Sequence, residues 1–468
     1  MRRAAPLVAA VMLLTSACSG GDTTATTSPP TTSTDAPAAT TTTDATTTPV
    51  DETPVDETPV EELTTRDLYD SVSPSLAFIE TELSTGSGVL LDSGWIVTSA
   101  HVIWPFDEVR VVFPDGTAFD RVPVVRADVY EDLAVVGPVA TEAPGLTLDP
   151  SVDYGVGDTV FLVGYPGEIE AFPTPAITQG VISRIRQWEG ADLTFLQTDA
   201  LIAGGQSGGA LVARNGALLG VSGLGGFTES NFALVAAAED LDERVAALIA
   251  GETPGRFDIH PIAGTDPSTE QEVNLASFWH EAILVATEPA GTELSIDVDE
   301  SHILDLTDAV GYSLSPSEEL TSSIAATTDH AEPHYVFVAA TQPGPSTTTV
   351  RSSHPLAIWS DPDDDQVVEP GDTVLAVLDV SGEFDVFRIA LRAGQPITVT
   401  VDGLLDAVVW IDRIGNPDEA LAFDDDSGGG LYGTNAQVEF TPDQDGEYLI
   451  VVSDVLLEPG VGYTLTIE

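Results

Sequence analysis

Short apolar stretches separated by turn residues recur along the chain from about residue 68 to residue 250. A typical stretch, residues 109–113, is followed by the turn Pro114-Asp115-Gly116. The other stretches cover residues 86–91, 94–98, 160–165 and 216–221. Strands this short and this evenly spaced are typical of β-barrels and β-sandwiches. We therefore expect an all-β domain over residues 65–251.

The end of this domain follows a different period. Leu241, Val245 and Leu248 are spaced by three or four residues, and Gly251 follows them. This spacing places the three side chains on one face of a helix, and glycine is common just past a helix end. The sequence predicts a closing amphipathic helix over residues 239–250.

The C-terminal half contains a diverged repeat. Residues 290–298 parallel residues 393–401, and residues 334–338 parallel residues 447–451. Apolar and polar residues alternate in these segments, which is the pattern of half-buried strands. We expect two β-sandwich, jelly-roll-like modules. They cover residues 255–358 and residues 366–468.

The first residues have the pattern of an export signal. Arginines at positions 2 and 3 precede an apolar run over residues 4–14, and small residues lie before Cys18. This run is too short to span a membrane, so residues 1–17 are predicted to be a secretory signal peptide. Cysteine after Ser16-Ala17 resembles a bacterial lipobox, although Thr15 stands where that pattern prefers leucine. The resemblance implies lipidation at Cys18, and the alternative is cleavage after Ala17 and release.

Residues 18–64 are rich in Thr, Pro, Ala, Ser and Asp and contain few apolar residues. Such a segment cannot bury a core, so we expect a disordered tether, with an O-glycosylated stalk as a further reading. Either form holds the folded part away from a membrane or a wall. The expected location is therefore extracytoplasmic, at the cell envelope and lipid-anchored, or otherwise secreted.

Charge narrows the range of partners. The chain of 468 residues has 15 basic and 76 acidic residues, a formal net charge of −61, and no lysine. Such a surface repels nucleic acid phosphates and anionic headgroups, so we expect no nucleic-acid partner and membrane contact through a lipid anchor alone. The single cysteine excludes an intrachain disulfide. Nothing in the sequence indicates an oligomeric state.

The candidate chemistry lies in three residues. His101, Asp132 and the glycine-flanked Ser207 occur in this order, 31 and 75 residues apart. A serine hydroxyl becomes a nucleophile when an imidazole removes its proton, and a carboxylate orients that imidazole. The pattern predicts a serine hydrolase that acts through a His-Asp-Ser triad and an acyl-enzyme.

The segments around these residues resemble the HtrA (DegP-type) trypsin-like proteases. They are Gly86-Ser87-Gly88-Val89, Val97-Thr98-Ser99-Ala100-His101, Asp132-Leu133-Ala134-Val135 and Gly205-Gln206-Ser207-Gly208-Gly209. The resemblance implies a chymotrypsin-like double β-barrel of two six-stranded barrels with the triad in the cleft between them. Gln206 stands where the family usually has asparagine. No PDZ domain is recognised, so peptide sensing and cage assembly are not carried over.

The same resemblance implies further site residues. The amides of Gly205 and Ser207 would form the oxyanion hole, and Ser222-Gly223 would lie along the substrate as a strand partner. Leu201 would form the base of the primary pocket, which then favours small or aliphatic side chains. The alternative for Leu201 is that it packs in the barrel core.

The last module resembles the bacterial pre-peptidase C-terminal domain. The residues that carry this resemblance are Phe387-Arg388-Ile389, Ala393-Gly394-Gln395, the acidic-glycine run 424–430, Asp445-Gly446-Glu447-Tyr448 and Gly462-Tyr463-Thr464-Leu465. We expect no cofactor and no metal site. Calcium stays open as an alternative at Asp361, Asp363 and Asp365 or at the acidic run, because oxygen ligands suit that ion.

Together these features predict an exported serine endopeptidase whose partners are protein or peptide substrates. The alternative is a cell-surface binding or adhesion protein in which the protease fold is a scaffold.

Overall fold

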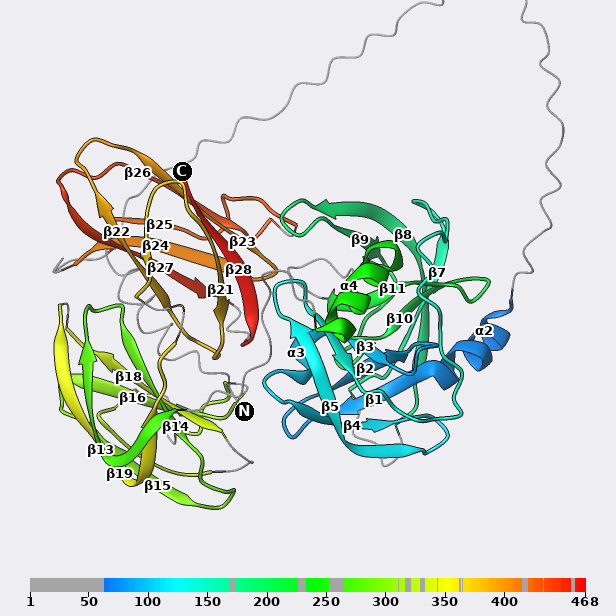
Figure 1. Ribbon diagram of the computed structural model, residues 1–468, viewed down its shortest axis with the longest axis horizontal. Coiled ribbons are helices and arrows are strands. Elements are labelled where there is room, and N and C mark those ends of the chain that lie inside the picture. The colour runs from blue at the N-terminus through cyan, green and yellow to red at the C-terminus, as the bar shows by residue number, and fades with distance from the viewer. Residues whose placement is uncertain are drawn as a thin grey trace, which may run out of the picture.

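The computed structural model describes residues 63–468 except 168–172, 226–232, 252–263, 310, 316–320, 329–332, 343, 362, 364, 415–419, 432 and 456–458. The predicted signal peptide, Cys18 and the tether up to residue 62 lie outside the described residues. A search of the described part for a membrane-spanning helix, long and apolar enough to cross, finds none. The folded chain has a pair of barrels on one side and two further β modules on the other (Figure 1).

The expected double β-barrel is confirmed: residues 76–237 form two closed six-stranded barrels. The first contains β1 (Leu76–Glu80), β2 (Thr85–Leu90), β3 (Ile96–Thr98), β4 (Glu108–Val112), β5 (Ala118–Asp128) and β6 (Leu133–Val136). The second contains β7 (Thr159–Gly164), β8 (Ala176–Trp188), β9 (Leu193–Thr198), β10 (Ala210–Ala213), β11 (Leu218–Gly225) and β12 (Ala233–Ala237). The helical elements are α2 (Thr65–Val72), the 3-10 turn η1 (Ser73–Ser75), α3 (Ala100–Ile103) and α4 (Ala238–Ala250).

One apolar core joins the two barrels. It contains Val97 and Val135 from the first barrel and Phe161 and Val212 from the second, all with no exposed surface. Burial of this much apolar surface holds the barrels at a fixed mutual position. The loops of the two barrels that carry the candidate residues therefore have a rigid support.

The closing helix is confirmed as α4. Leu241, Val245 and Leu248 face this joint core, as their spacing predicted. Gly251 ends the helix in a left-handed conformation (φ 75°), from which its amide donates to the carbonyls of Ala247 and Leu248. A residue with a side chain would be strained in that conformation.

Seven strands of the first C-terminal module correspond in order and pairing to seven strands of the second. The first set is β13 (Thr265–Leu275), β14 (Glu281–Ala286), β15 (Glu293–Asp297), β16 (His302–Thr307), β17 (Ser323–Thr327), β18 (His334–Ala340) and β19 (Ser346–Ile358). The second is β21 (Thr373–Leu378), β22 (Asp385–Leu391), β23 (Ile397–Gly403), β24 (Ala407–Arg413), β26 (Ala436–Phe440), β27 (Gly446–Asp454) and β28 (Val461–Ile467), with the short β20 (Val367–Val368) and β25 (Ala422–Asp424) added.

The second module is a sandwich of a five-stranded and a four-stranded sheet over one core. In the first module the same two layers form one seven-stranded sheet, because β14 also pairs with the end of β19 at Leu284 and Val285. The sequence repeat is thus a repeat of strand topology. We call residues 366–468 the C-terminal sandwich and residues 264–358 the first module.

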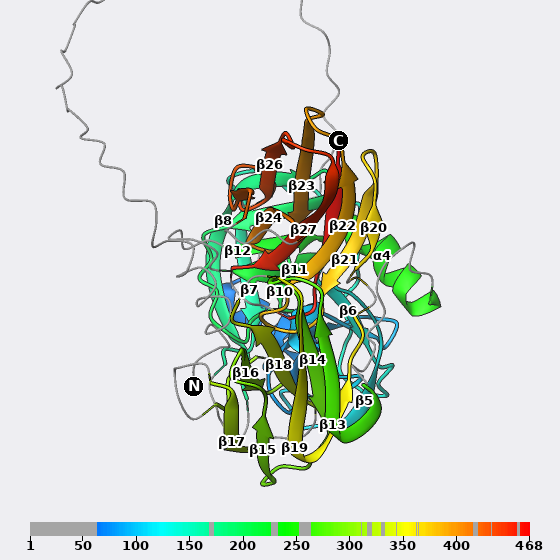
Figure 2. The ribbon, with the colours of Figure 1, turned by 90° about the vertical axis from the view of Figure 1, so that its left-hand side faces the viewer.

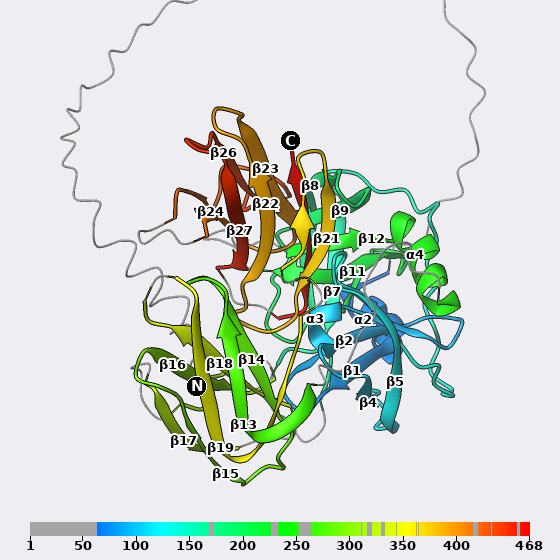
Figure 3. The ribbon, with the colours of Figure 1, turned by 60° about the vertical axis from the view of Figure 1, so that its left-hand side comes forward.

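The C-terminal sandwich packs against both the first module and the barrels (Figures 2 and 3). Trp279 of the first module stacks on Trp410, with ring centroids 5.4 Å apart, and its Nε1 donates to Asp412 at 2.9 Å. On the other side, Leu404 and Leu431 join a buried cluster with residues of the barrels. The sandwich is therefore a packed part of one structure with the barrels.

Candidate active site

His101 and Asp132 are brought into contact by the antiparallel pairing of two buried strands, because one residue follows the first strand and the other precedes the second. His101 lies in α3, directly after β3, and Asp132 lies directly before β6, which pairs with β3. The ring Nδ1 of His101 lies 2.9 Å from both carboxylate oxygens of Asp132, and the His101 amide also donates to Oδ1 at 2.9 Å. The Asp132 side chain is 10% exposed and that of His101 is 32% exposed. This geometry fixes the orientation of the imidazole through its Nδ1.

The backbone at Asp132 is strained, since its φ of 54° lies in the left-handed region. The preceding residue, Glu131, is buried and forms a two-pronged ion pair with Nε of Arg244 from α4, at 2.9 and 3.0 Å. The same guanidinium donates to the carbonyls of Ala191 and Asp192 at the β8–β9 turn. Strained residues persist when their surroundings fix them, and this ion pair is one such restraint.

The Ser207 loop is formed around two glycines with positive φ. Gly205 has a φ of 89° and Gly208 a φ of 81°. A Cβ on Gly208 would lie 2.0 Å from the carbonyl oxygen of Ser87, so no side chain fits there. The Ser87 amide donates to the Ser207 carbonyl at 2.8 Å, which ties this loop of the second barrel to β2 of the first.

Ser222 connects the candidate segments. Its carbonyl accepts from Ser99 Oγ at 3.2 Å and from the Gly208 amide at 2.6 Å. Its buried hydroxyl donates to the Gln206 carbonyl at 2.7 Å and accepts from the Gly209 amide at 3.0 Å. The residue after it, Gly223, adjoins the carboxylate: an added Cβ would lie 3.3 Å from Asp132 Oδ2. The structure therefore brings the His101, Asp132 and Ser207 segments together around β11.

The two amides predicted as oxyanion donors belong to Gly205 and Ser207 of this loop. Among the described residues, neither the Gly205 nor the Ser207 amide donates a hydrogen bond to a protein acceptor. The buried Gln206 side chain lies between them in sequence and accepts from the Ala203 amide at 2.7 Å. The glutamine at this position therefore makes a hydrogen bond within the loop.

Leu201 lies on the surface. Its side chain is 66% exposed, and its carbonyl accepts from Thr178 Oγ1 at 2.8 Å. The alternative that Leu201 packs inside the barrel core does not describe this position. An open apolar side chain on the loop that leads to Ser207 leaves room for a substrate contact.

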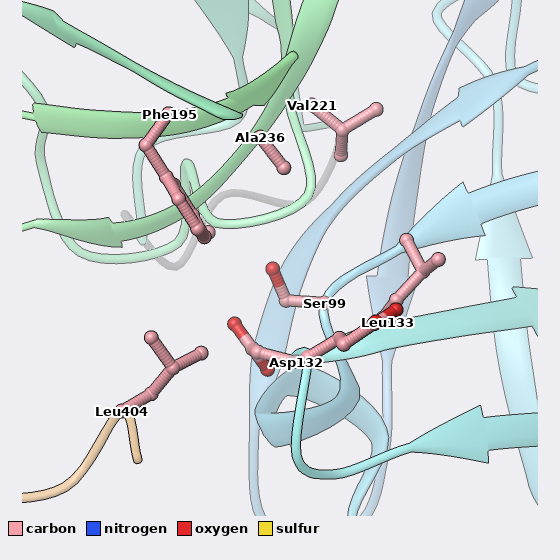
Figure 4. Close-up of a pocket in the computed structure, with 9 residues that line it drawn as sticks. Ser99, Asp132, Leu133, Phe195, Val221, Ala236 and Leu404 are labelled. Carbon is pink, nitrogen blue, oxygen red and sulfur yellow. The ribbon is translucent and has the colours of Figure 1, made fainter. Parts of the chain in front are cut away.

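Sequence reasoning missed three contributors to the site. Arg244 and Glu131 form the ion pair next to Asp132, and Leu404 of the C-terminal sandwich lines a cavity together with Asp132 (Figure 4). The one local signal was the acidic residue directly before Asp132. Each contact joins segments far apart in the chain, so the sequence pattern gives no spacing by which to find it.

A buried carboxylate cluster lies between the two C-terminal modules. Carboxylate oxygens of Asp361, Glu383 and Asp385 lie within 4.8 Å of one another, a set that could hold a metal ion. Burial and the neighbouring carboxylates raise the pKa of Glu383 well above its usual value. The three aspartates considered as calcium ligands from the sequence have different partners in the structure. Asp361 belongs to this cluster, Asp363 accepts from the Val377 amide, and Asp365 pairs with Arg388 at 2.8 Å.

Comparison with known proteins gives a partial match. Residues 86–221 match the family described as trypsin-like peptidase domain. The serine endoprotease DegS of Salmonella typhimurium is 37% identical over 171 residues, 35% of this chain and 46% of that protein. The "Probable periplasmic serine endoprotease DegP-like" of Halomonas elongata is 34% identical over 163 residues, 33% of each. The chain spans less than half the length of these relatives.

Among solved structures, the one titled "HtrA-type protease AlgW with decapeptide" is 23% identical, covers 41% of this chain and 69% of its own, and has a TM-score of 0.36.

Proposed function

We propose that this chain, which contains an HtrA-type trypsin-like peptidase domain, is a serine endopeptidase. The observation that carries the proposal is the contact of His101 with Asp132 at 2.9 Å, together with a Ser207 loop in which two glycines have positive φ. The curated serine endoproteases that match this domain support the same activity.

In the proposed reaction Ser207 Oγ attacks the scissile carbonyl while His101 removes its proton. Asp132 holds the imidazole through Nδ1 and stabilises its positive charge. The Gly205 and Ser207 amides stabilise the oxyanion, and such donors contribute about 2.7–4 kcal/mol each in other enzymes. His101 then protonates the leaving amine, and a water molecule releases the acyl group by the same steps. These steps use the chain's own residues, so we propose no cofactor for hydrolysis.

We propose that the substrates are proteins or peptides with a small or aliphatic residue at the cleaved bond. Leu201 offers an apolar contact, and Ser222-Gly223 offers the backbone of β11 as a strand partner. An apolar pocket discriminates weakly, so the preference is graded. The Halomonas relative is named as a probable periplasmic protease, which supports an extracytoplasmic location, and we propose a lipid anchor at Cys18 for this chain. We also propose that the C-terminal sandwich is a pre-peptidase C-terminal-type domain.

The test is covalent labelling of the full chain with a fluorophosphonate probe, beside Ser207→Ala and Ser75→Ala. Ser75 is a buried serine in η1, remote in sequence from the candidate loop. We expect labelling of the parent and of Ser75→Ala, and none of Ser207→Ala. Labelling that survives in Ser207→Ala, or no labelling of a folded parent chain, would reject the proposal and leave the binding-protein alternative.

A further inference from the structure

A side chain of the C-terminal sandwich lines the same cavity as the carboxylate of Asp132. Leu404, in the loop after β23, is 4% exposed. Together with Ser99, Asp132 and Phe195 it lines a cavity of about 10 Å³ (Figure 4). A space of this size holds one water molecule at most. The Asp132 side chain, which is 10% exposed, therefore has little contact with water on this side.

The same module holds the loop that leads to Asp132. The Gly462 amide donates to the Val129 carbonyl at 3.2 Å, and a Cβ on Gly462 would lie 2.9 Å from Tyr130 Cα. Tyr130 packs on Trp188 with ring centroids 4.7 Å apart, and Trp188 Nε1 contacts the Asp402 carboxylate at 3.3 Å. The loop is thus enclosed between the β8–β9 hairpin and the sandwich.

A third contact reaches the segment that carries His101. Trp104, directly after α3, is buried, and its Nε1 donates to the Asp379 carbonyl at 3.1 Å. Gly460 packs against the ring of Trp104 so closely that an added Cβ would lie 2.4 Å from it. The sandwich therefore touches both segments that supply the His101–Asp132 pair.

We propose that Leu404 is a positioning residue of the active site: it fixes the strained Asp132 loop and keeps water from the Asp132 carboxylate. This inference rests on the proposed function, because it assigns Leu404 a part in the same reaction. Arg244 restrains the loop from α4, and Leu404 restrains it from the sandwich. Leu404 acts through Asp132, with no role in the chemical steps.

The charged groups around this loop have their own contacts. Glu131 faces Arg244, while Asp402 contacts Trp188 and the side-chain amide of Asn435. Asp132 faces His101. Removing the Leu404 side chain admits water beside Asp132, which weakens the attraction between this carboxylate and a protonated His101. The midpoint of the His101 titration then moves to lower pH.

The first experiment measures this titration by NMR on isotope-labelled histidine in the full chain carrying Ser207→Ala, so that it needs no activity. His101→Gln assigns the resonance among the seven histidines. We expect Leu404→Ala to lower the midpoint by about half a pH unit or more, and Leu404→Met, which keeps the volume, to restore it. Leu404→Val, a smaller truncation, carries the test if Leu404→Ala fails to fold.

Leu431→Ala is the matched control. Leu431 is 5% exposed and belongs to the same buried cluster, but it does not line the cavity at Asp132. We expect it to leave the His101 midpoint unchanged. An unchanged midpoint in a folded Leu404 truncation, or an equal shift in Leu431→Ala, would overturn the assignment of Leu404.

The second measurement uses the chain with Ser207 intact. Leu404→Ala should lower kcat by about tenfold to a hundredfold with KM within about twofold, since small displacements of catalytic groups have effects of this size. A parent chain that cleaves no peptide would reject the proposed function, and the titration still decides on Leu404. An active parent with unchanged kcat and midpoint in Leu404→Ala would overturn the positioning role alone.

Discussion

At the scale of single residues, the Ser207 loop depends on Gly208 having no Cβ atom. Gly208 combines a left-handed backbone with contacts that leave no space for a Cβ, against Ser87 and Thr98 of the first barrel. Gly204, four residues earlier in the same loop, has no atom within 4 Å of the position that a Cβ would take. The loop therefore has space for a Cβ at Gly204 and none at Gly208.

We predict that Gly208→Ala lowers the free energy of unfolding by about 2–4 kcal/mol and lowers the rate of fluorophosphonate labelling at least about a hundredfold, because strain and overlap both displace the loop. Gly204→Ala should change the free energy of unfolding by about 0.5 kcal/mol or less. Urea unfolding and labelling kinetics measure the two effects. Equal behaviour of the two variants would contradict the packing described for Gly208.

The contact of His101 with Asp132 was predictable at this scale, and the residues that support it were not. His101, Asp132 and the Ser207 loop occur in short segments whose residue types indicate a serine hydrolase. Leu404 occurs in a segment that reads as an ordinary strand end. Its role depends on the docking of two modules, which a local pattern does not describe.

At the scale of elements, α4 restrains the active site as well as closing the barrels. Arg244 projects from α4 to the buried Glu131 and to the carbonyls of the β8–β9 turn. Its side chain is 18% exposed and that of Glu131 is 1% exposed. A charge this deeply buried is costly when its counter-ion is removed.

We predict that Arg244→Met lowers the free energy of unfolding by about 3–5 kcal/mol. Adding Glu131→Gln should recover most of this loss, because the buried negative charge is then absent. Chemical denaturation of the single and double variants forms a double-mutant cycle. Arg110→Met is the control, since Arg110 pairs with Glu80 and Asp120 at the surface and should change stability by about 1 kcal/mol or less. A loss as small as that of the control would contradict the buried ion pair.

Elements with a clear period were predicted closely. The expected helix 239–250 is α4, Ala238–Ala250, and the expected stretch 109–113 is β4, Glu108–Val112. The helix α2 was not predicted, because Leu68 and Val72 supply too short an apolar period within eight residues. The joining of the first module into one sheet was also missed, since it depends on two residue pairs between β14 and β19.

At the scale of the whole molecule, acidic charge is concentrated as well as abundant. The net charge is −61, and Asp361, Asp363, Glu383 and Asp385 gather where the two C-terminal modules meet. Burial, with the charge of Asp361, raises the pKa of Asp363 to about 6. Burial and neighbouring carboxylates also raise the pKa of Glu383.

These shifts determine how stability depends on pH. A carboxyl whose pKa is higher in the folded state than in the unfolded state binds protons more readily when folded. Below the pKa of the unfolded state, near 4, such a carboxyl does not lower the free energy of unfolding. The free energy of unfolding falls as the pH rises from this value to the pKa of the folded state. Above the pKa of the folded state the loss is complete. For Asp363 this window extends from about pH 4 to about pH 6.

We predict that the melting temperature rises as the pH is lowered from 7 toward 5 in metal-free buffer. Glu383→Gln should raise the melting temperature at pH 8 by about 2 °C or more and make its pH dependence shallower. Glu369→Gln removes the same charge from an exposed site of the sandwich and is the control. Differential scanning calorimetry checks this, and a melting temperature that falls on mild acidification would refute it.

The contact between Trp104 and Asp379 joins residues 275 positions apart, and the sandwich that makes it includes β28, which pairs with β21 and β23. A ribosome delivers His101, Asp132 and Ser207 long before this strand. The Leu404 side chain therefore reaches the Asp132 loop only after the three segments have been made. Chain order sets the order of assembly: a chain clipped before β28 keeps His101, Asp132 and Ser207 but lacks the strand that pairs with β23, next to Leu404.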